Sequence, residues 1–316
     1  MAVNQKRLNV TQFDFDDVKD NLKTFLKAQS EFTDYDFEGS GMSALLDVLA
    51  YNTHYLGFNA NMLANEMFLD SASLRSSVVS HAKMLGYEVA SPRAPVATVN
   101  VTLNTDNGLA TMPAGTAFTT SVDGVSFQFV TINDVTGQNT GNSIPFDGTK
   151  IYEGTYTKTK YLVDSNDVDQ RFMLTDVRAD TTTLTVKVQN SATDTTTTTY
   201  TKATDITQLS STSTVYFLQE VDGGRFEIYF GDGATSKAVE DGNIVVLSYV
   251  ITNKTAANGA AAFSSPSSID GNTNITVTTV ANAVGGGEPE TISSIKLNAP
   301  LDYASQGRAV TAEDYK

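Results

Sequence analysis

The stretch MSALLDVLAYNTHYLGFNANMLANEMFLD, residues 42–70, has helical periodicity and apolar side chains on more than one face. Its apolar residues recur three and four positions apart, the spacing that places side chains on one face of a helix. A surface helix needs only one apolar stripe, so a helix that is apolar most of the way round must be covered on several sides. We therefore expect a helix over residues 42–69 that contacts other chains, with Gly57 as a candidate break into two helices.

The large side chains of this stretch are candidates for binding a partner. Aromatic residues and methionine are enriched in protein interfaces, and both are frequent here. The alternative is that these side chains close a small core within their own chain. The interface hypothesis assigns partner binding to Leu45, Leu49, Tyr51, Tyr55, Phe58, Met62, Met67 and Phe68.

Two further helices are expected on either side of this stretch. In DFDDVKDNLKTFLKAQ, residues 14–29, the apolar residues share one helical face and acidic residues crowd the first turn, where the helix dipole favours them. A third helix is expected to begin with Ser71 or Ser73 as its cap and to end at Gly86, a residue suited to the left-handed conformation.

From residue 96 onward the apolar period changes to two, which is typical of strands. FTTSVDGVSFQFV, residues 118–130, places Asp123-Gly124 between two such runs, and this pair favours a tight hairpin turn. Further hairpins are expected over residues 181–201 and 214–230, and the threonine run 195–199 is interpreted as part of an exposed edge hairpin. After the strands, Pro289 and the acids beside it predict a short helix over residues 289–298 that Pro300 closes.

These patterns predict an α+β fold in three parts. A helical N-terminal assembly domain spans residues 1–95, and a hairpin-rich, mainly antiparallel β domain spans 96–284. Residues 285–316 form a linker, with the glycines 285–287 as a hinge, and then the start of a further α/β domain. GRAVTAEDYK, residues 307–316, has a capping pattern at Thr311 and Asp314 with no helix after it, so we expect a longer parent chain.

Composition argues against several classes of partner. The chain has 316 residues and a formal charge of −15, whereas binding to nucleic acid depends on Lys and Arg releasing counterions. An anionic membrane surface is disfavoured for the same reason, and no apolar run approaches the length that crosses a bilayer. Without cysteine there is no disulfide, thiolate nucleophile or cysteine-ligated zinc. We expect no nucleic acid, no membrane and no cofactor.

No catalytic, metal-binding or cofactor-binding residue is assigned. His54 and His81 lack a second histidine at helical spacing, and DSNDVD, residues 164–169, lacks the glycine of a calcium loop. Two alternative functions stay open: a surface adhesin or carbohydrate-binding β protein, from the threonine-rich strands, and a hydrolase using paired carboxylates. Turn chemistry instead explains the aspartates that precede glycine, which are Asp123, Asp147, Asp222, Asp232, Asp241 and Asp270.

Several stretches together resemble a known family. FEIYFGDG (226–233), GNIVVLSYVIT (242–252), GGGEPETISSIKLNAP (285–300) and RAVTAEDY (308–315) are similar to segments of phage baseplate J-like proteins. The helical front, residues 45–95, resembles the N-terminal region of the wedge subunit of T4-like contractile-tailed phages. The family-motif turn consists of Phe230, Gly231, Asp232 and Gly233, and the sequence departs from the family pattern at Ser236, Lys254 and Lys296.

The resemblance implies a non-enzymatic structural role in the virion. It implies that the subunit pairs with a second copy of itself and with other baseplate wedge proteins through a helical bundle. It also implies contacts with neighbouring wedges that form a ring around the tail hub, and it leaves contact between the β domain and the hub open. The segment RAVTAEDY would open a further α/β domain.

Overall fold

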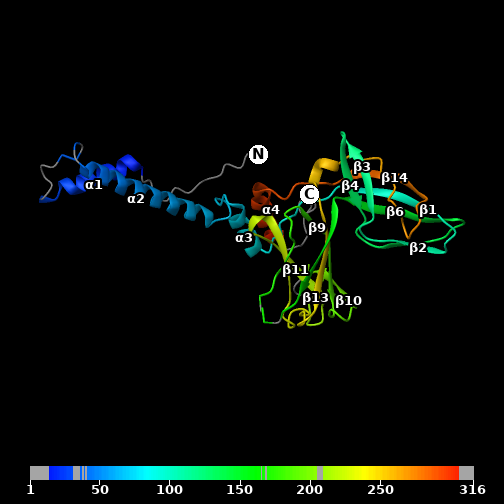
Figure 1. Cartoon of the computed structure of the whole chain (residues 1–316). Coiled ribbons are helices and arrows are strands. Elements are labelled where there is room, and N and C mark those ends of the chain that lie inside the picture. Colours follow the sequence, from blue (N-terminus) through cyan, green and yellow to red (C-terminus); the bar gives the residue numbers. More distant parts are fainter. Residues whose placement is uncertain are drawn as a thin grey trace. The chain divides into compact units, whose positions relative to one another are not determined.

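The computed structural model describes residues 14–30, 36, 37, 39, 41–164, 166, 167, 169–204 and 209–305 (Figure 1). The chain forms two compact units, unit 1 with residues 1–87 and 292–316 and unit 2 with residues 88–291. Unit 1 is helical and unit 2 is built of antiparallel and mixed sheets, so the expected α+β class is confirmed. The division into three domains stays a prediction, and the expected start of a further domain at 306–316 lies outside the described residues.

Unit 1 contains four described helices: α1 (Phe15–Lys27), α2 (Gly41–Glu66), α3 (Arg75–Met84) and α4 (Ile292–Ser305). The carboxylate of Asp14 accepts a hydrogen bond from the Phe15 N–H at 2.7 Å and begins α1. An ion pair of 2.5 Å between Lys19 and Asp47 joins α1 to α2. Helix α4 packs on α3, and the Lys296 ammonium donates to the Asp70 carbonyl at 2.9 Å.

Helix α2 differs in two ways from the expectation. It runs without a break through Gly57, because one glycine inside a helix costs only about 1 kcal/mol relative to alanine. It also ends at Glu66, three residues before the expected end, so Met67 and Phe68 lie in the turn that follows it.

Helix α4 begins later than the predicted helix over 289–298. Residue Glu290 is held in an extended segment, where its N–H donates to the Ala90 carbonyl at 3.0 Å and its carboxylate accepts from the Ala90 N–H at 3.2 Å. The helix starts only at Ile292, and Pro300 lies inside it. Proline removes one helical hydrogen bond without ending this helix, which continues to Ser305.

Unit 2 consists of two larger sheets and a small one. The five-stranded sheet has the order β14-β1-β6-β4-β3, with β1 (Val96–Asn104), β3 (Ala117–Val122), β4 (Val125–Val130), β6 (Ser143–Glu153) and β14 (Ile275–Val284). The seven-stranded sheet has the order β7-β13-β9-β10-β11-β12-β8, with β7 (Thr155–Leu162), β8 (Phe172–Met173), β9 (Ala179–Gln189), β10 (Thr197–Lys202), β11 (Val215–Val221), β12 (Arg225–Phe230) and β13 (Ile244–Ile251). Strands β2 (Leu109–Met112) and β5 (Val135–Gln138) pair with each other.

The alternation of apolar and polar residues in the sequence corresponds to alternating burial in these strands. In β1 every second residue is buried, including Val99, Val101 and Leu103 in the core of the five-stranded sheet. The Asp123-Gly124 pair joins β3 to β4 with φ of 49° and 80°, as a tight primed turn requires.

Two of the smaller predictions about turns and edges need correction. Strand β10 as a whole is not an edge strand, because it pairs with β9 over Thr197–Tyr200 and in parallel with β11 at Thr201 and Lys202, although the pairing with β11 includes none of the threonine run. Asp147-Gly148 is not a turn, because both residues lie inside β6 at a bulge opposite β1. There the Gly148 N–H donates to the Asn100 side chain at 2.8 Å, with a φ of 65° that suits glycine.

The glycines 285–287 are not a free hinge. The N–H of Gly286 donates to the Asn258 side-chain oxygen at 3.0 Å, and the Asn258 amide donates back to the Gly286 carbonyl at 3.1 Å. A Cβ on Gly286 would overlap the Lys254 carbonyl oxygen, so the segment is packed where only glycine fits. Gly287 forms an isolated bridge with Arg93.

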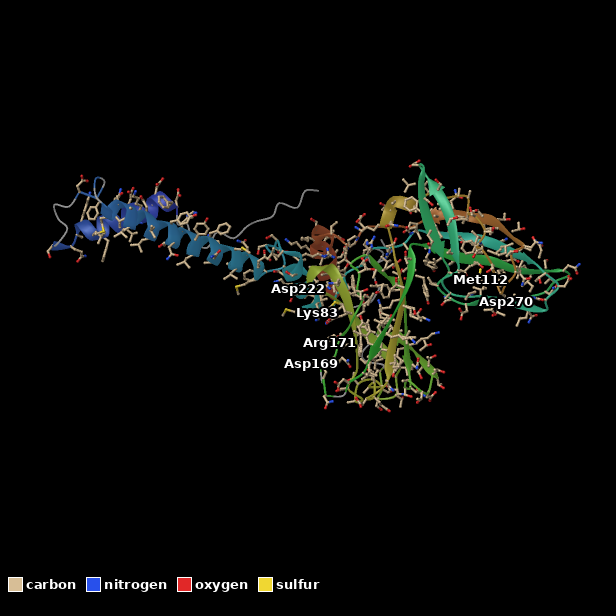
Figure 2. The ribbon with its side chains drawn as sticks, in the orientation of Figure 1. Lys83, Met112, Asp169, Arg171, Asp222 and Asp270 are labelled. Carbon is tan, nitrogen blue, oxygen red and sulfur yellow. The ribbon has the colours of Figure 1, made fainter. Side chains whose placement is uncertain are left out.

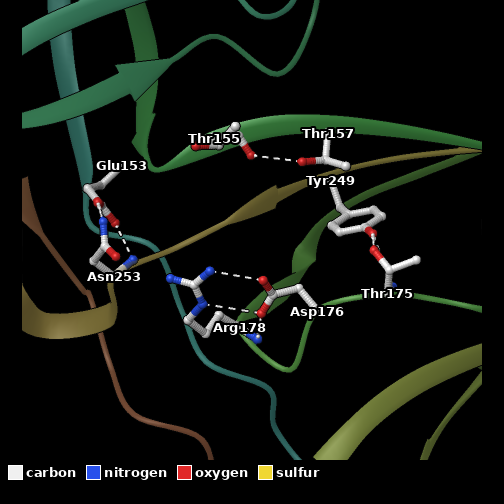
Figure 3. A network of polar contacts seen from close by, with 8 residues as sticks. All are labelled: Glu153, Thr155, Thr157, Thr175, Asp176, Arg178, Tyr249 and Asn253. Atoms are coloured by element: carbon white, nitrogen blue, oxygen red, sulfur yellow. Dashed lines mark hydrogen bonds and ion pairs between the residues drawn. The ribbon is translucent and has the colours of Figure 1, made fainter.

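The two larger sheets are joined at a buried carboxylate. The chain passes from β6 to β7 through Gly154 alone, whose φ is 125° and whose added Cβ would overlap the Ile251 carbonyl oxygen. Beside it, the fully buried carboxylate of Glu153 accepts hydrogen bonds from the Thr252 hydroxyl at 2.7 Å and from the Asn253 N–H at 2.8 Å. The Asn253 side chain donates a further bond at 2.7 Å, and Figure 3 shows it facing Glu153. These hydrogen bonds hold the connection between β6 and β7 against the segment that follows β13.

Further polar contacts surround this joint in unit 2. The Arg178 guanidinium pairs with Asp176 at 2.9 Å, and the buried Tyr249 hydroxyl lies 3.0 Å from the Thr175 hydroxyl (Figure 3). The buried carboxylate of Asp180 accepts from the Ala94 N–H at 2.8 Å and so attaches the segment before β1 to β9. Of these groups Tyr249 and Asp180 are buried, and because both are paired their burial is tolerated and the geometry of the joint is specific.

Replacing Glu153 with glutamine is expected to destabilise unit 2 by about 2–4 kcal/mol, because charge-assisted bonds are lost and an amide group then faces buried donors. The change is measured as a lower urea midpoint of the full chain followed by tyrosine fluorescence. Glu288→Gln is the matched control, since Glu288 pairs with Lys254 at the surface and such pairs contribute at most about 1 kcal/mol. Equal effects of the two substitutions would contradict the role given to Glu153.

Candidate functional site

The residues assigned to partner binding form an exposed apolar surface on unit 1. All eight have exposed side chains, with exposed fractions of 59% for Leu45, 60% for Phe58 and 67% for Met67. Of the residues of α2, only Leu46, Ala50 and Gly57 are buried. Figure 2 shows side chains projecting from α2 along its whole length. The structure therefore leaves this surface open within the described chain, and its partner stays a prediction.

The sequence-based assignment missed residues of the same surface. Val48, Leu56 and Leu63 are exposed by 66%, 60% and 68%, as much as the residues that were chosen. They belong to the same periodic stretch, and the choice favoured aromatic residues and methionine over aliphatic ones. On α4 of the same unit, Leu297 and Tyr303 are also exposed, and no signal in the sequence separated them from core positions.

Two tyrosines of this surface are ordered by each other. The hydroxyl of Tyr51 donates to the hydroxyl of Tyr55 at 2.9 Å, and the ring centroids lie 4.6 Å apart in an edge-to-face arrangement. The hydrogen bond to Tyr55 raises the pKa of Tyr51. The two rings, one helical turn apart, therefore restrict each other's conformations.

The end of α2 is coupled to the start of α3 by Glu66. Its carboxylate accepts hydrogen bonds from the Ser73 N–H at 2.8 Å, the Ser73 hydroxyl at 2.7 Å and the Leu74 N–H at 3.2 Å. The expected caps Ser71 and Ser73 are therefore wrong, because Leu74 is the N-cap, without a side-chain cap, and the Glu66 carboxylate of the preceding helix accepts from the Ser73 and Leu74 N–H groups. The Ser71 hydroxyl donates instead to the Asn65 carbonyl at 2.6 Å.

The same contacts determine the charge of Glu66. Burial alone raises its pKa, but the hydrogen bonds from Ser73, Ser77 and Leu74 outweigh it and lower the pKa to about 2. His81 makes a second contact between α3 and the end of α2, since its Nε2 lies 2.9 Å from the Glu66 carbonyl oxygen. His81 therefore has a structural contact and is not placed as a general base.

The family-motif turn follows β12 in unit 2. The carboxylate of Asp232 accepts from the Ala234 N–H at 3.0 Å and the Thr235 N–H at 3.1 Å, and these bonds lower its pKa. Gly233 has a φ of 86°, and its N–H donates to the Ser236 carbonyl at 2.9 Å. Gly231 is packed so closely that a Cβ would overlap the Ser236 Oγ. The motif therefore encodes a compact turn.

Phe230 connects this turn to the core of the seven-stranded sheet. Its ring packs edge-to-face on Phe172 at 5.5 Å and on Tyr200 at 5.1 Å between centroids. Each residue of the motif thus has a structural role, because Phe230 anchors the turn, Asp232 caps it, and the glycines permit its backbone.

The remaining candidates for chemistry are dispersed. Asp222 and Asp270 lie at separate turns of unit 2, well apart in Figure 2. Asp164 accepts from the Asn166 N–H at 2.9 Å, a local turn contact, and no cluster that could hold a metal is present among the described residues. None of the described helices combines the length and apolar content needed to cross a membrane.

A shallow cleft of about 390 Å³ lies beside β3. Its lining consists of hydroxyl, methyl and phenyl groups, from Thr119, Thr120, Ser121, Ser126, Ala262, Phe263 and Ser264. None of these side chains titrates near neutral pH, so the cleft offers no general acid or base.

Two family models of baseplate wedge proteins match parts of this chain. Residues 14–87 match the family model described as baseplate wedge protein gp6-like, helical domain, and residues 157–261 match bacteriophage baseplate wedge protein gp6, third domain. Baseplate wedge protein gp6 of Enterobacteria phage T4 is 31% identical over 331 residues, which cover 95% of this chain and 48% of that protein. This chain therefore spans about half the length of the T4 protein.

One similar solved structure is the six-fold symmetrised cryo-EM structure of the anti-feeding prophage baseplate. It aligns with a TM-score of 0.33 and 14% identity, over 97% of this chain and 63% of that chain. The two family models include both features described above, since α2 lies within residues 14–87 and the motif turn lies within 157–261.

The contact between Glu66 and α3 makes unit 1 sensitive to acid. Because the folded pKa of about 2 lies below the ordinary value of 4.5, the stabilisation is complete above pH 4.5 and is lost as the pH falls toward 2. Glu66→Gln should lower the melting temperature of the helical signal at pH 6. Circular dichroism at 222 nm should show this difference shrinking between pH 4.5 and 2. A difference that stays constant over this range would contradict the assignment.

Gly231→Ala is expected to destabilise unit 2 by about 1–3 kcal/mol, because the new methyl group overlaps Ser236. Ser236→Ala alone should be nearly neutral, since its Oγ is buried without a hydrogen-bond partner. The double variant should recover part of the loss in urea unfolding. Gly108→Ala is the control, because a Cβ there meets no atom within 4 Å. A single Gly231→Ala variant as stable as this control would contradict the close packing.

Proposed function

The chain belongs to the gp6-like family of baseplate wedge proteins, and on this premise we propose that it is a structural, non-enzymatic part of a phage baseplate wedge. We further propose that α2 enters a helical bundle with a second copy of the chain and with a different wedge protein. In this proposal neighbouring wedges join into a ring around the tail hub. The observation that carries the proposal is the exposed apolar surface of α2.

Most of the large exposed apolar residues of α2 fall on two faces, and the exposed Val48 lies between them. With 100° per residue, Leu45, Leu49, Leu56 and Leu63 lie within about 40° of each other and form what we call the aliphatic face. Tyr51, Tyr55, Phe58 and Met62 lie within about 60° and form the aromatic face. The centres of the two faces are about 125° apart around the helix. One partner helix cannot cover both.

A third direction around α2, that of Leu46 and Ala50, is buried within unit 1. Leu46 and Ala50 are buried and lie about 105° and 130° from the centres of the aliphatic and aromatic faces. Helix α1 contacts α2, and the ion pair of Lys19 with Asp47 lies between this buried direction and the aromatic face. Helix α2 therefore has three apolar directions, one covered by its own unit and two available, as a bundle with two external partners requires.

The apolar area of each face sets how much its partner must contribute. Burying the exposed half of a leucine or phenylalanine side chain contributes about 1 kcal/mol, so the four residues of either face contribute about 4 kcal/mol. Each association costs about 4–15 kcal/mol in lost freedom, and two partners bear this cost separately. A stable contact at either face therefore requires a partner that buries apolar surface of its own.

Variants that place a charge on one face test the proposal. Leu56→Asp and Phe58→Asp should each weaken association of the full chain at least ten-fold, because a carboxylate would be buried in the bundle. Self-association is measured by sedimentation, and binding of a second wedge protein is measured by co-purification after co-expression. Both side chains are exposed, so the fold of the free chain should be unchanged in circular dichroism.

Thr195→Asp provides the control, since it adds the same charge at an exposed loop of unit 2. Association of both face variants at wild-type strength, with the second wedge protein present, would overturn the proposal. Loss of only one kind of partner in each variant would assign that partner to that face.

A further inference from the structure

The edges of the two larger sheets are protected unequally. An unpaired edge strand exposes backbone N–H and C=O groups that can pair with another chain, and proteins usually blunt such edges with charges, brevity or a covering segment. Strand β7 carries the exposed Lys158 and Lys160, and β8 has only two residues. Edge strand β3 is bridged by Ser264, whose N–H donates to the Thr119 carbonyl at 2.8 Å.

Strand β14 is neither short nor charged, and no covering segment pairs with most of its length. It has ten residues, ITVTTVANAV, without a charged residue or proline. At its C-terminal end the Ala283 N–H donates to the Ala260 carbonyl at 2.9 Å, so a loop covers the edge there. Thr276, Thr278 and Val280 are exposed. The uncovered part of this edge is therefore residues 275–281.

The hydrogen-bond register shows which backbone groups are available. The Asn104 N–H donates to the Asn274 carbonyl at 2.9 Å, so these two residues form a hydrogen-bonded pair between β1 and β14. Such pairs alternate along an antiparallel ladder, which directs the backbone groups of Thr276 and Thr278 toward β1. The backbone groups of Val277 and Thr279 consequently point away from the sheet, and the described backbone contacts assign them no partner.

We propose that this edge pairs antiparallel with β14 of a second copy of the chain, with Thr278 opposite Thr278 of that copy. In this register Val277 of each copy is opposite Thr279 of the other, and the two pairs exchange four backbone hydrogen bonds. Thr276 lies opposite Val280, and the threonines at the centre lie opposite each other, pairings that favour strands. The contact is in unit 2 and uses no residue of α2.

Local chemistry identifies a second copy as the occupant. The chain carries a formal charge of −15, so most of its surface repels another copy, whereas an uncharged edge allows two copies to meet without opposing like charges. A basic partner would find no carboxylate on this strand with which to form an ion pair. The outward groups at 277 and 279 are placed symmetrically about an exposed residue, so the edge is complementary to itself under two-fold symmetry.

A single cysteine tests the register, because the chain has no cysteine of its own. In a non-hydrogen-bonded antiparallel pair the Cα atoms lie about 4.5 Å apart, within the range that a disulfide can bridge. Thr278→Cys should therefore give a covalent dimer under mild oxidation. Thr276→Cys alone should give at least ten-fold less, but mixed with Val280→Cys it should cross-link, since those positions are opposite each other. Non-reducing gels and mass spectrometry identify the linked peptides.

A charge at the centre of the edge tests the strength of the pairing. Thr278→Lys should weaken dimerisation at least ten-fold in sedimentation, and Thr195→Lys should leave it unchanged. Repeating both measurements in the Leu56→Asp and Phe58→Asp background separates strand pairing from association through α2. Thr278→Cys chains that stay monomeric on oxidation, that link through another register, or that link to a co-expressed wedge protein instead would overturn the inference.

Discussion

Helix α2 has more apolar surface than its own unit covers, and this constraint governs unit 1. Its 26 residues are mostly apolar, yet only Leu46, Ala50 and Gly57 are buried. A helix in this condition gains stability mainly from tertiary packing, because intrinsic propensity contributes little. The contacts within the chain act at its ends, through the ion pair of Lys19 and Asp47 and through the Glu66 carboxylate. They leave the aliphatic and aromatic faces of the helix exposed within the described chain.

In unit 2, by contrast, buried contacts within the unit itself hold the sheets together. The Glu153 carboxylate and the Gly154 backbone fix the place where the chain passes between the larger sheets, and Asp180 attaches the segment before β1. Buried carboxylates are tolerated only when partners satisfy them, and Glu153 and Asp180 each accept several hydrogen bonds. Such a joint has a specific geometry, since paired polar groups allow few alternative arrangements.

The chemistry of the motif turn serves backbone geometry. Asp232 accepts two backbone N–H groups and Gly231 leaves no room for a methyl group beside Ser236. A carboxylate used in this way is not available for acid–base catalysis. This agrees with a cleft that lacks titratable side chains and with the absence of a metal-binding cluster among the described residues. Among the described acidic residues, Asp164 and Asp232 thus act in turns and Asp14 at a helix start.

The amino-acid sequence by itself determined the class of each region. Helical period over residues 14–85, strand period from Val99 onward and the turn at Asp123-Gly124 depend on local chemistry, and each is present in the structure. Contacts distant in sequence were decided only by the tertiary structure. Ala90 holds Glu290 and delays α4, and β11 pairs with the end of β10. Glu66 replaces the expected serine caps from the preceding helix, seven and eight residues before Ser73 and Leu74. In each case the hydrogen bonds come from outside the element itself, so local propensity cannot indicate them. The same reason applies to the free edge of β14, because a strand's neighbours, and therefore its exposed backbone groups, depend on the topology of the whole sheet.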